Sequence, residues 1–192
     1  MTEPLATSLS LLARLGGRDS VAWERLVTLY RPLVLSWCLR SGLGTTDADD
    51  VAQEVFVAVA TGLASFKRQR EGSFRAWVRG ITRHKLLDHA RRVQREGQAA
   101  GGTEANERLH GLPDPQNADQ DALETSLLYR RALDLIRGEF EEKTWEAFWR
   151  SAVEEQDTAA VAAALGMSST AVRIAKSRVL ARLREEAGEL LD

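Results

Sequence analysis

Apolar residues recur along most of this chain at intervals of three and four, and no segment keeps a period-two alternation of β-branched residues for long. The first spacing places side chains on one face of an α-helix, whereas a half-buried strand needs the second. Glycines stand where several of these periodic segments end, as at Gly16-Gly17, Gly42 and Gly44. The sequence therefore predicts an all-α fold.

One segment rich in glycine and proline interrupts the helical pattern. Residues 97–121 contain four glycines, two prolines and few large apolar side chains, which is typical of a flexible linker. Helical periodicity resumes around Ala122, with apolar positions at Leu123, Leu127, Leu128, Ala132, Leu133, Leu135 and Ile136. Because 192 residues leave room for two small domains, we expect helical domains at 1–96 and 122–192.

The composition is that of a globular protein in a reducing compartment. Hydrophobic residues make up 44% of the chain and charged residues 28%. No apolar run approaches the ~20 residues that span a bilayer, and the segment with Glu3 and Pro4 lacks the basic start of a signal peptide. Cys38 is the single cysteine, so neither an internal disulfide nor a zinc-binding cysteine pair can form. We expect a cytoplasmic protein without cofactor or metal.

The net charge of −2 conceals a segregation of charge along the chain. From Lys67 to Arg95, ten basic residues stand against two acidic ones, which leaves +8. From Glu96 to Ser126, seven acidic residues stand against one arginine, which leaves −6. A second basic stretch near the C-terminus contains Arg173, Lys176, Arg178, Arg182 and Arg184. Concentrated positive charge attracts phosphates, and the opposite charges would also let the two domains close on each other.

The second basic stretch lies in a helix-turn-helix pattern. Asp157-Thr158 can cap a short helix, and Gly166-Met167-Ser168 can form a tight turn after it. Ser168 or Ser169 can then cap a longer helix whose inward face carries Val172, Ala175, Val179 and Leu183. The opposite face, which would reach a major groove, carries Arg173, Ile174, Ser177, Arg178 and Ala181. The alternative is a helical hairpin with a solvated basic face.

A second basic helix is expected from Ser73 to about Arg95. Phe74 and Trp77 stand beside a ladder formed by Arg75, Arg79, Arg83, Lys85, Arg91 and Arg92. Such a helix suits melted DNA, because phosphates meet cations while unstacked bases find aromatic faces. The alternative for both aromatic residues is a place in the core, which we favour for Trp77.

The helix expected from Asp47 to Phe66, with Thr46 as its cap, is acidic at its start. Its carboxylates are Asp47, Asp49, Asp50 and Glu54, and its apolar stripe is Val51, Val55, Phe56 and Val59. The carboxylates can serve the helix dipole, bind a metal or offer a docking face to a protein. Metal binding is the weakest of the three, because hard cations need several converging oxygen ligands.

Taken in order, these motifs resemble the extracytoplasmic-function RNA polymerase sigma factors of the sigma-70 family. The resemblance rests on Asp47–Phe56, Phe74–His84, Asp88–Arg92 and the helix-turn-helix, and it runs from about Leu9 to Arg184. It implies a sigma-2-like helical bundle in the first domain and a sigma-4-like helix-turn-helix domain in the second. The acidic linker would then pass through the RNA exit region of the polymerase.

The resemblance also implies a role for each motif. The acidic helix would dock on the clamp helices of the β′ subunit through Asp47, Asp49, Asp50, Gln53, Glu54 and Phe56. The next helix would open and hold the −10 element through Arg75, Trp77, Arg79, Arg83, His84, Lys85, Asp88, Arg91 and Arg92. The last would read the −35 element through Ser169, Thr170, Arg173, Ile174, Ser177 and Arg178. The second domain would rest on the β flap, and an anti-sigma factor is a further candidate partner.

The chain departs from the family at two positions. His84 stands where asparagine is frequent, near the pocket that captures a flipped −10 base. Arg173-Ile174-Ala175 aligns with a frequent Lys-Ser-Arg run, so an arginine is missing at Ala175. The −35 contacts would then shift to Arg173, Ser177 and Arg178, and the promoter sequence does not follow from these residues.

Two other kinds of function compete with this one. A helix-turn-helix regulator that does not bind polymerase stably would be expected to carry a ligand pocket or dimer face in its first half, where this chain has a basic and an acidic helix. A metal-dependent nuclease could use the acidic cluster, yet no Gly-rich phosphate loop, Cys/His cluster or Ser-His-Asp order supports an enzyme. The sequence favours a promoter-specificity subunit with no catalytic activity of its own.

Overall fold

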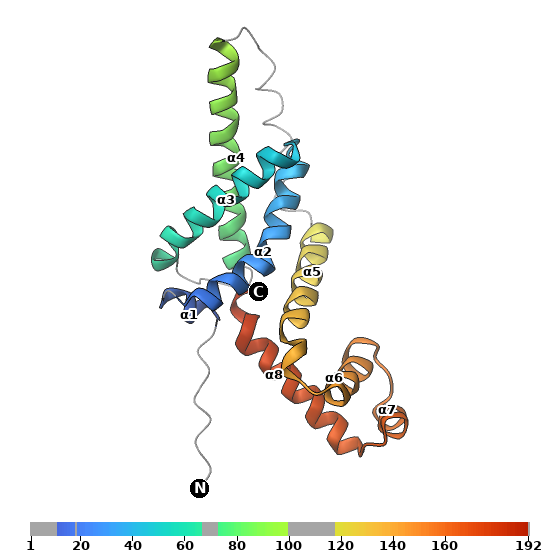
Figure 1. The fold of residues 1–192 in the computed structure, drawn as a ribbon. Coiled ribbons are helices and arrows are strands. Elements are labelled where there is room, and N and C mark those ends of the chain that lie inside the picture. The colour runs from blue at the N-terminus through green and yellow to red at the C-terminus, as the bar shows by residue number, and fades with distance from the viewer. Residues whose placement is uncertain (1–10, 18, 67–72, 100–117, 192) are drawn as a thin grey trace.

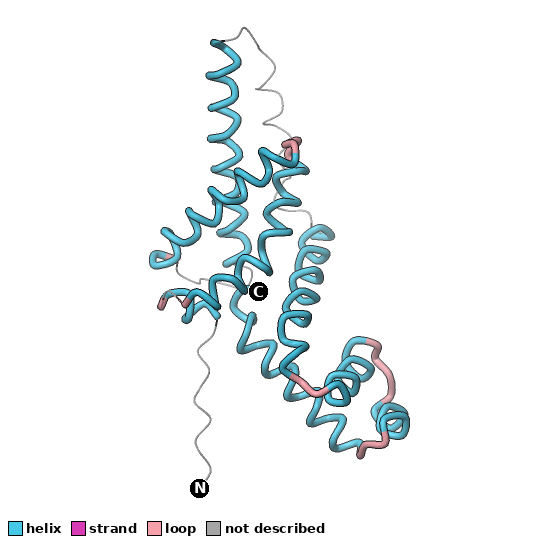
Figure 2. The backbone as a smooth tube through the Cα atoms, in the orientation of Figure 1, coloured by secondary structure: helices cyan, strands magenta, loops and turns pink. Residues whose placement is uncertain are grey.

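The computed structural model describes residues 11–17, 19–66, 73–99 and 118–191 of the chain, and these contain eight α-helices and no strand (Figures 1 and 2). The expected all-α fold is confirmed. The first half consists of α1 (Leu11–Gly16), α2 (Ser20–Arg40), α3 (Thr45–Gly62) and α4 (Ser73–Ala99). The second consists of α5 (Ala118–Ile136), α6 (Glu142–Phe148), α7 (Thr158–Leu165) and α8 (Ser169–Leu191). Most of the expected linker, residues 100–117, lies outside the described ranges.

Two of the helix starts in the first half illustrate different capping. The Asp19 carboxylate caps α2 by accepting hydrogen bonds from the backbone nitrogens of Val21 at 2.9 Å and Ala22 at 3.2 Å. The expected cap of α3, Thr46, was wrong: the cap residue is Gly44, in an extended conformation and without a side-chain hydrogen bond. Asp47 remains in the first turn of α3, where the positive end of the helix dipole favours a carboxylate.

The helix-turn-helix forms as its sequence predicts. The Asp157 carboxylate accepts hydrogen bonds from the backbone of Ala159 and Ala160 at 2.8 and 3.1 Å, which starts α7. Gly166 ends that helix in the left-handed region at φ +58°, a conformation that glycine adopts without steric cost. Ser168 Oγ then accepts a hydrogen bond from Ala171 N at 3.1 Å, so Ser168 is the residue that caps α8.

The two halves share one hydrophobic core. Buried residues of the first half, such as Leu29, Val34 and Val55, belong to the same cluster as Leu128 and Val179 of the second. Within this cluster, α5 packs against α2, while α8 packs against α1 and α4 (Figure 1). The helix-turn-helix has a small core of its own, formed by Ala147, Val161, Ala162, Val172 and Ala175. The halves are therefore packed together rather than held only by a linker.

Across the described residues, no individual helix combines the length and apolarity needed to cross a bilayer. One pair meets the criterion jointly, α7 with the Ser169–Glu186 part of α8, across a bend of 102°.

Candidate polymerase-binding and DNA-binding surfaces

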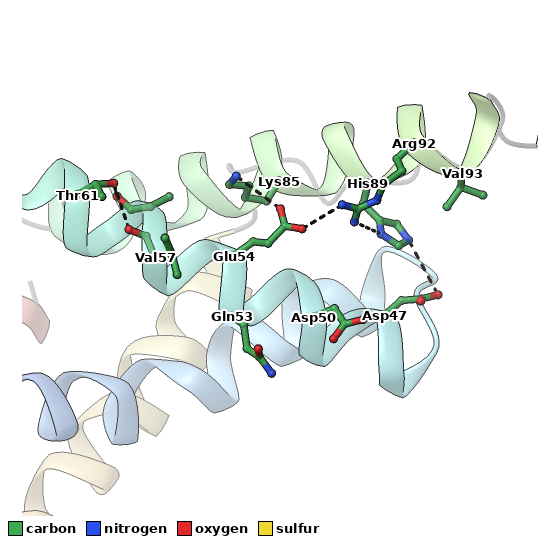
Figure 3. A pocket seen from close by; sticks show the side chains of 11 residues that line it. Asp47, Asp50, Gln53, Glu54, Val57, Thr61, Lys85, His89, Arg92 and Val93 are labelled. Atoms are coloured by element: carbon green, nitrogen blue, oxygen red, sulfur yellow. Dashed lines mark hydrogen bonds and ion pairs between the residues drawn. The ribbon is translucent and has the colours of Figure 1, made fainter. Parts of the chain in front are cut away.

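The acidic cluster of α3 lies on the surface. The side chains of Asp47 and Asp49 are 55% and 47% exposed, and Asp50 and Gln53 are exposed as well. Asp47, Asp50, Gln53 and Glu54 line a groove of about 880 Å³ between α3 and α4 (Figure 3). Among the described residues, no three His, Cys, Asp or Glu side chains are grouped as metal ligands would be.

Ion pairs cross this groove from the acidic helix to the basic one. Glu54 lies 3.2 Å from an Arg92 nitrogen and 3.5 Å from Lys85 Nζ (Figure 3). The ring nitrogen Nε2 of His89 lies 3.9 Å from the Asp47 carboxylate, a contact that is an ion pair only when the imidazole is protonated. On the other side of α3, Asp49 pairs with an arginine of α2 at 2.7 Å. Pairs as exposed as these contribute at most about 1 kcal/mol each, so a binding partner can replace them at low cost.

Two aromatic candidates are part of the core. Phe56 is 8% exposed and packs edge-on against Trp23, with ring centroids 6.3 Å apart. Trp77 is half-buried, with its ring centroid 5.0 Å from that of Phe66 and 5.6 Å from that of Phe74. A Cβ atom at Gly62 would lie 3.0 Å from the Trp77 ring, so glycine permits this close approach. The core position favoured for Trp77 is what the structure has.

The first two arginines of α4 contact the second half of the chain. Arg75 donates to the backbone oxygen of Asp121 at 3.1 Å and to the Thr125 hydroxyl. Arg79 pairs with the Asp121 carboxylate at 2.9 Å and with Glu124. These arginines are therefore occupied by α5, and they are less exposed than Arg83 and Arg91.

The remaining α4 candidates are more accessible. Arg83, His84, Asp88 and Arg91 are exposed, and Arg91 forms a pair with Asp88 one turn away at 3.5 Å. The His84 ring nitrogen Nδ1 lies 2.7 Å from the backbone oxygen of Gly80, which fixes the orientation of the ring. The basic ladder is thus divided between an interdomain part, a groove part and an open part.

The faces of α8 are sorted as the helical wheel predicts. The inward positions Val172, Ala175, Val179 and Leu183 are each 6% exposed or less. The opposite positions are exposed, namely Thr170, Arg173, Ile174, Ser177 and Arg178, while Ser169 is half-buried. The second helix of the helix-turn-helix therefore presents a polar, basic face with a single large apolar side chain, Ile174, which is 52% exposed.

Sequence reasoning missed the buried carboxylate of Glu124. It is 2% exposed and accepts hydrogen bonds from Trp37 Nε1 at 2.8 Å, Arg40 at 2.9 Å and Gln120 at 3.0 Å. Burial acts to raise the pKa of this carboxyl, but the hydrogen bonds and the nearby Arg79 charge outweigh it, so the pKa is lower than usual. One signal was present: Glu124 precedes Leu128 by four residues and so shares its buried face.

Comparison with known proteins identifies the family of this chain. The family model described as Sigma-70 region 2 matches residues 26–96, from α2 to α4. The chain is 32% identical over 179 residues to the ECF RNA polymerase sigma factor SigD of Mycobacterium tuberculosis, covering 88% of this chain and 78% of the relative. The chain belongs to the extracytoplasmic-function (ECF) sigma factors. A further ECF RNA polymerase sigma factor, ShbA of Streptomyces griseus, is 32% identical over 176 residues, 86% of this chain and 87% of its own.

Membership decides the general role of the protein. As an ECF sigma factor, it is a promoter-specificity subunit of RNA polymerase. The region 2 match contains both the acidic α3 and the basic α4, and the similarity to the curated sigma factors spans most of the chain. Along the chain of this sigma factor, the acidic helix α3 comes first, the basic helix α4 follows it, and the helix-turn-helix of α7 and α8 comes last.

Proposed function

We propose that this sigma factor binds core RNA polymerase in the cytoplasm, recognises −35 and −10 promoter DNA, and helps to open the promoter. The observation that carries the proposal is that one chain combines a region 2 match over α2 to α4 with a helix-turn-helix whose basic face is exposed. A regulator that bound DNA alone would need only the second of these features.

The exposed face of α8 supports recognition of the −35 element. Arg173 and Arg178 project from the same side of the helix as Ser177 and are free of the core. Arginine in a major groove can donate two hydrogen bonds to guanine or hold a phosphate, and a serine can contact a base or a phosphate. Because Ala175 is buried, the arginine frequent there in the family would have no place at the DNA surface in this chain.

The open part of α4 supports recognition of the −10 element. Arg83, His84 and Arg91 offer two cations and an aromatic ring on an exposed surface, the combination that suits phosphates and unstacked bases. Lys85 and Arg92 would join them by exchanging Glu54 for phosphate. Trp77 would contribute indirectly, because its packing against Phe66 and Phe74 holds α4 in position.

Two surfaces are proposed for core polymerase. The exposed carboxylates of Asp47 and Asp50, with Gln53, form the face of α3 that would dock on the β′ clamp helices. On α5, Leu123 and Leu127 are 59% and 40% exposed and lie one turn apart. This exposed apolar pair is the surface that we propose for the contact of the second half with the β flap. An anti-sigma factor stays a candidate partner from the family resemblance alone.

Run-off transcription on a library of genomic fragments tests this function. Core polymerase is assayed with and without the protein, and transcript starts are mapped. We expect a set of starts that depends on the added protein and that shares two sequence elements upstream. If the protein binds DNA fragments but leaves the transcripts of core polymerase unchanged, it is instead a helix-turn-helix regulator that acts without stable polymerase binding.

A further inference from the structure

The exposed face of α8 carries one large apolar side chain among polar ones. Ile174 is 52% exposed, and among the α8 side chains that the structure describes no other large apolar one is exposed. It belongs to neither of the two hydrophobic clusters of buried residues. Its neighbours on that face are Thr170, one turn before it, and Ser177 and Arg178, one turn after it. The core of the helix-turn-helix therefore does not account for an isoleucine at this position.

The packing of α8 fixes the side of the helix on which Ile174 lies. Val172 and Ala175 are 1% and 4% exposed and pack in the small core of the helix-turn-helix. A position two residues from a buried one lies on the opposite side of a helix, so the anchoring of Val172 holds Ile174 outward. A β-branched side chain also has one strongly preferred rotamer in a helix, so little conformational freedom is lost when it meets a partner.

The cations of α8 that remain available lie on both sides of this isoleucine. Lys176 donates a hydrogen bond to a backbone oxygen at 3.4 Å, and Arg182 forms an ion pair at 2.6 Å, so both are engaged within the protein. Arg173 and Arg178 are exposed, and neither has an ion-pair partner among the described residues. One directly precedes Ile174 and the other follows it by one turn. DNA that binds these two arginines would therefore also contact the isoleucine.

An aliphatic side chain in a major groove has one apolar group to contact, the C5-methyl group of thymine. The other groups on the base edges are hydrogen-bond donors and acceptors, which gain nothing from an aliphatic neighbour. In a helix-turn-helix, the residues near the N-terminus of the second helix meet the base edges, and Ile174 is the sixth residue of α8. Its place in the helix thus suits contact with a base rather than with the DNA backbone alone.

We propose that Ile174 contacts the methyl group of a thymine in the −35 element and makes this sigma factor specific for an A·T pair at that step. Arg173 and Arg178 hold the helix in the groove, and Ile174 selects the base. The inference rests on the proposed function, because it takes the exposed face of α8 as the surface that reads the −35 element.

Replacement of thymidine by deoxyuridine tests the contact, because deoxyuridine lacks only the C5-methyl group and still pairs with adenine. The DNA is a fluorescein-labelled promoter recovered by run-off mapping, with each thymine of its −35 element, on either strand, replaced in turn. Holoenzyme formed from core polymerase and the full chain is titrated on each DNA. The wild-type protein is compared with Ile174→Ala and with Val21→Ala, a β-branched residue of α2 that is 49% exposed. Circular dichroism checks that each variant keeps its helices.

We expect one deoxyuridine position to weaken binding by wild-type holoenzyme about 4-fold, the equivalent of the ~0.8 kcal/mol gained by burying one methylene-sized group. The same replacement should leave binding by the Ile174→Ala holoenzyme unchanged. Val21→Ala should respond as the wild type does. Loss of the response in Ile174→Ala alone assigns the methyl contact to this side chain.

Equal sensitivity of wild type and Ile174→Ala to every replacement would overturn the proposal, and so would a −35 element without thymine on either strand. If Ile174→Ala lowers co-purification with core polymerase in the absence of DNA, the side chain contacts a protein instead, and the proposal is wrong. A wild-type holoenzyme that requires the −35 element but responds to no methyl group contradicts this inference alone. A chain that directs no transcription by core polymerase contradicts the proposed function, and the thymine contact fails with it.

Discussion

Trp37 Nε1 donates a 2.8 Å hydrogen bond to the carboxylate of Glu124, a residue 87 positions later in the chain. The first belongs to α2 and the second to α5, so this bond joins the two halves of the sigma factor. Both residues are buried, with exposures of 4% and 2%. The bond is therefore a buried part of the contact between the two halves, and removing it measures how much it contributes to stability.

Replacing Trp37 by phenylalanine should lower the free energy of unfolding by about 1–3 kcal/mol, because a buried carboxylate then lacks one donor. The aromatic packing is largely retained, so the loss comes mainly from the hydrogen bond. Urea denaturation followed by circular dichroism measures it. Trp23→Phe, at a half-buried position of the same helix that packs on Phe56, is the matched control and should cost less.

Acid should weaken the contact between the halves. The pKa values of Glu124 and Glu186 lie below the ordinary 4.5, because hydrogen bonds and arginine charges outweigh the effect of burial. A carboxyl with a lowered pKa in the folded protein stabilises it above the ordinary value, and this stability is lost as the pH falls below 4.5 toward the lowered pKa.

The midpoint of thermal unfolding, measured from neutral pH into this acidic range, follows that loss. The wild-type midpoint should fall more steeply than that of Glu124→Gln, which has no proton to bind at this position. Parallel curves for the two proteins would mean that Glu124 does not contribute through its charge.

The two faces of α8 should separate DNA binding from stability. Arg178→Ala removes an exposed cation and should weaken promoter binding by about 1–3 kcal/mol with unchanged folding stability. Leu183→Ala removes a side chain that is 6% exposed and should destabilise the fold by about 2–5 kcal/mol. Binding isotherms on a promoter and denaturation curves measure the two effects. If Arg178→Ala weakens binding equally on all DNA sequences, the arginine contacts a phosphate and not a base.

The exposed face of α3 should govern association with core polymerase. Asp50→Arg reverses a charge in the groove beside α4, and we expect it to reduce co-purification with core polymerase while circular dichroism stays unchanged. Glu185→Arg, the same reversal of charge at an exposed position of α8, is the matched control. Equal recovery of the two variants with core polymerase would remove α3 from the docking surface.

The local structure could largely be predicted from the sequence. Helical spacing predicted that Val172, Ala175 and Val179 share the buried face of α8. The 3.6-residue period of a helix is enough to show which side chains lie on the same face. Asp157 was identified as a cap because its carboxylate bonds to backbone nitrogens two and three residues away. These features depend on neighbours in sequence.

The interdomain contact could not be predicted in the same way. Periodicity shows that a helix has a buried face, and it does not show what covers that face. Leu123 and Glu124 therefore exchange their expected places: the leucine is 59% exposed, while the glutamate is buried against donors from α2 and α4. The helix also begins at Ala118, before the expected start around Ala122, so that Asp121 lies on α5.

The most direct test of the central claim is run-off transcription from one promoter recovered from the fragment library, with its −35 and −10 elements scrambled separately. Core polymerase with this protein should start at one position on the intact promoter. Scrambling either element should abolish that start, because we propose that the two halves of the chain read different elements. Transcription that persists without the protein, or that depends on neither element, would contradict its role as the promoter-specificity subunit.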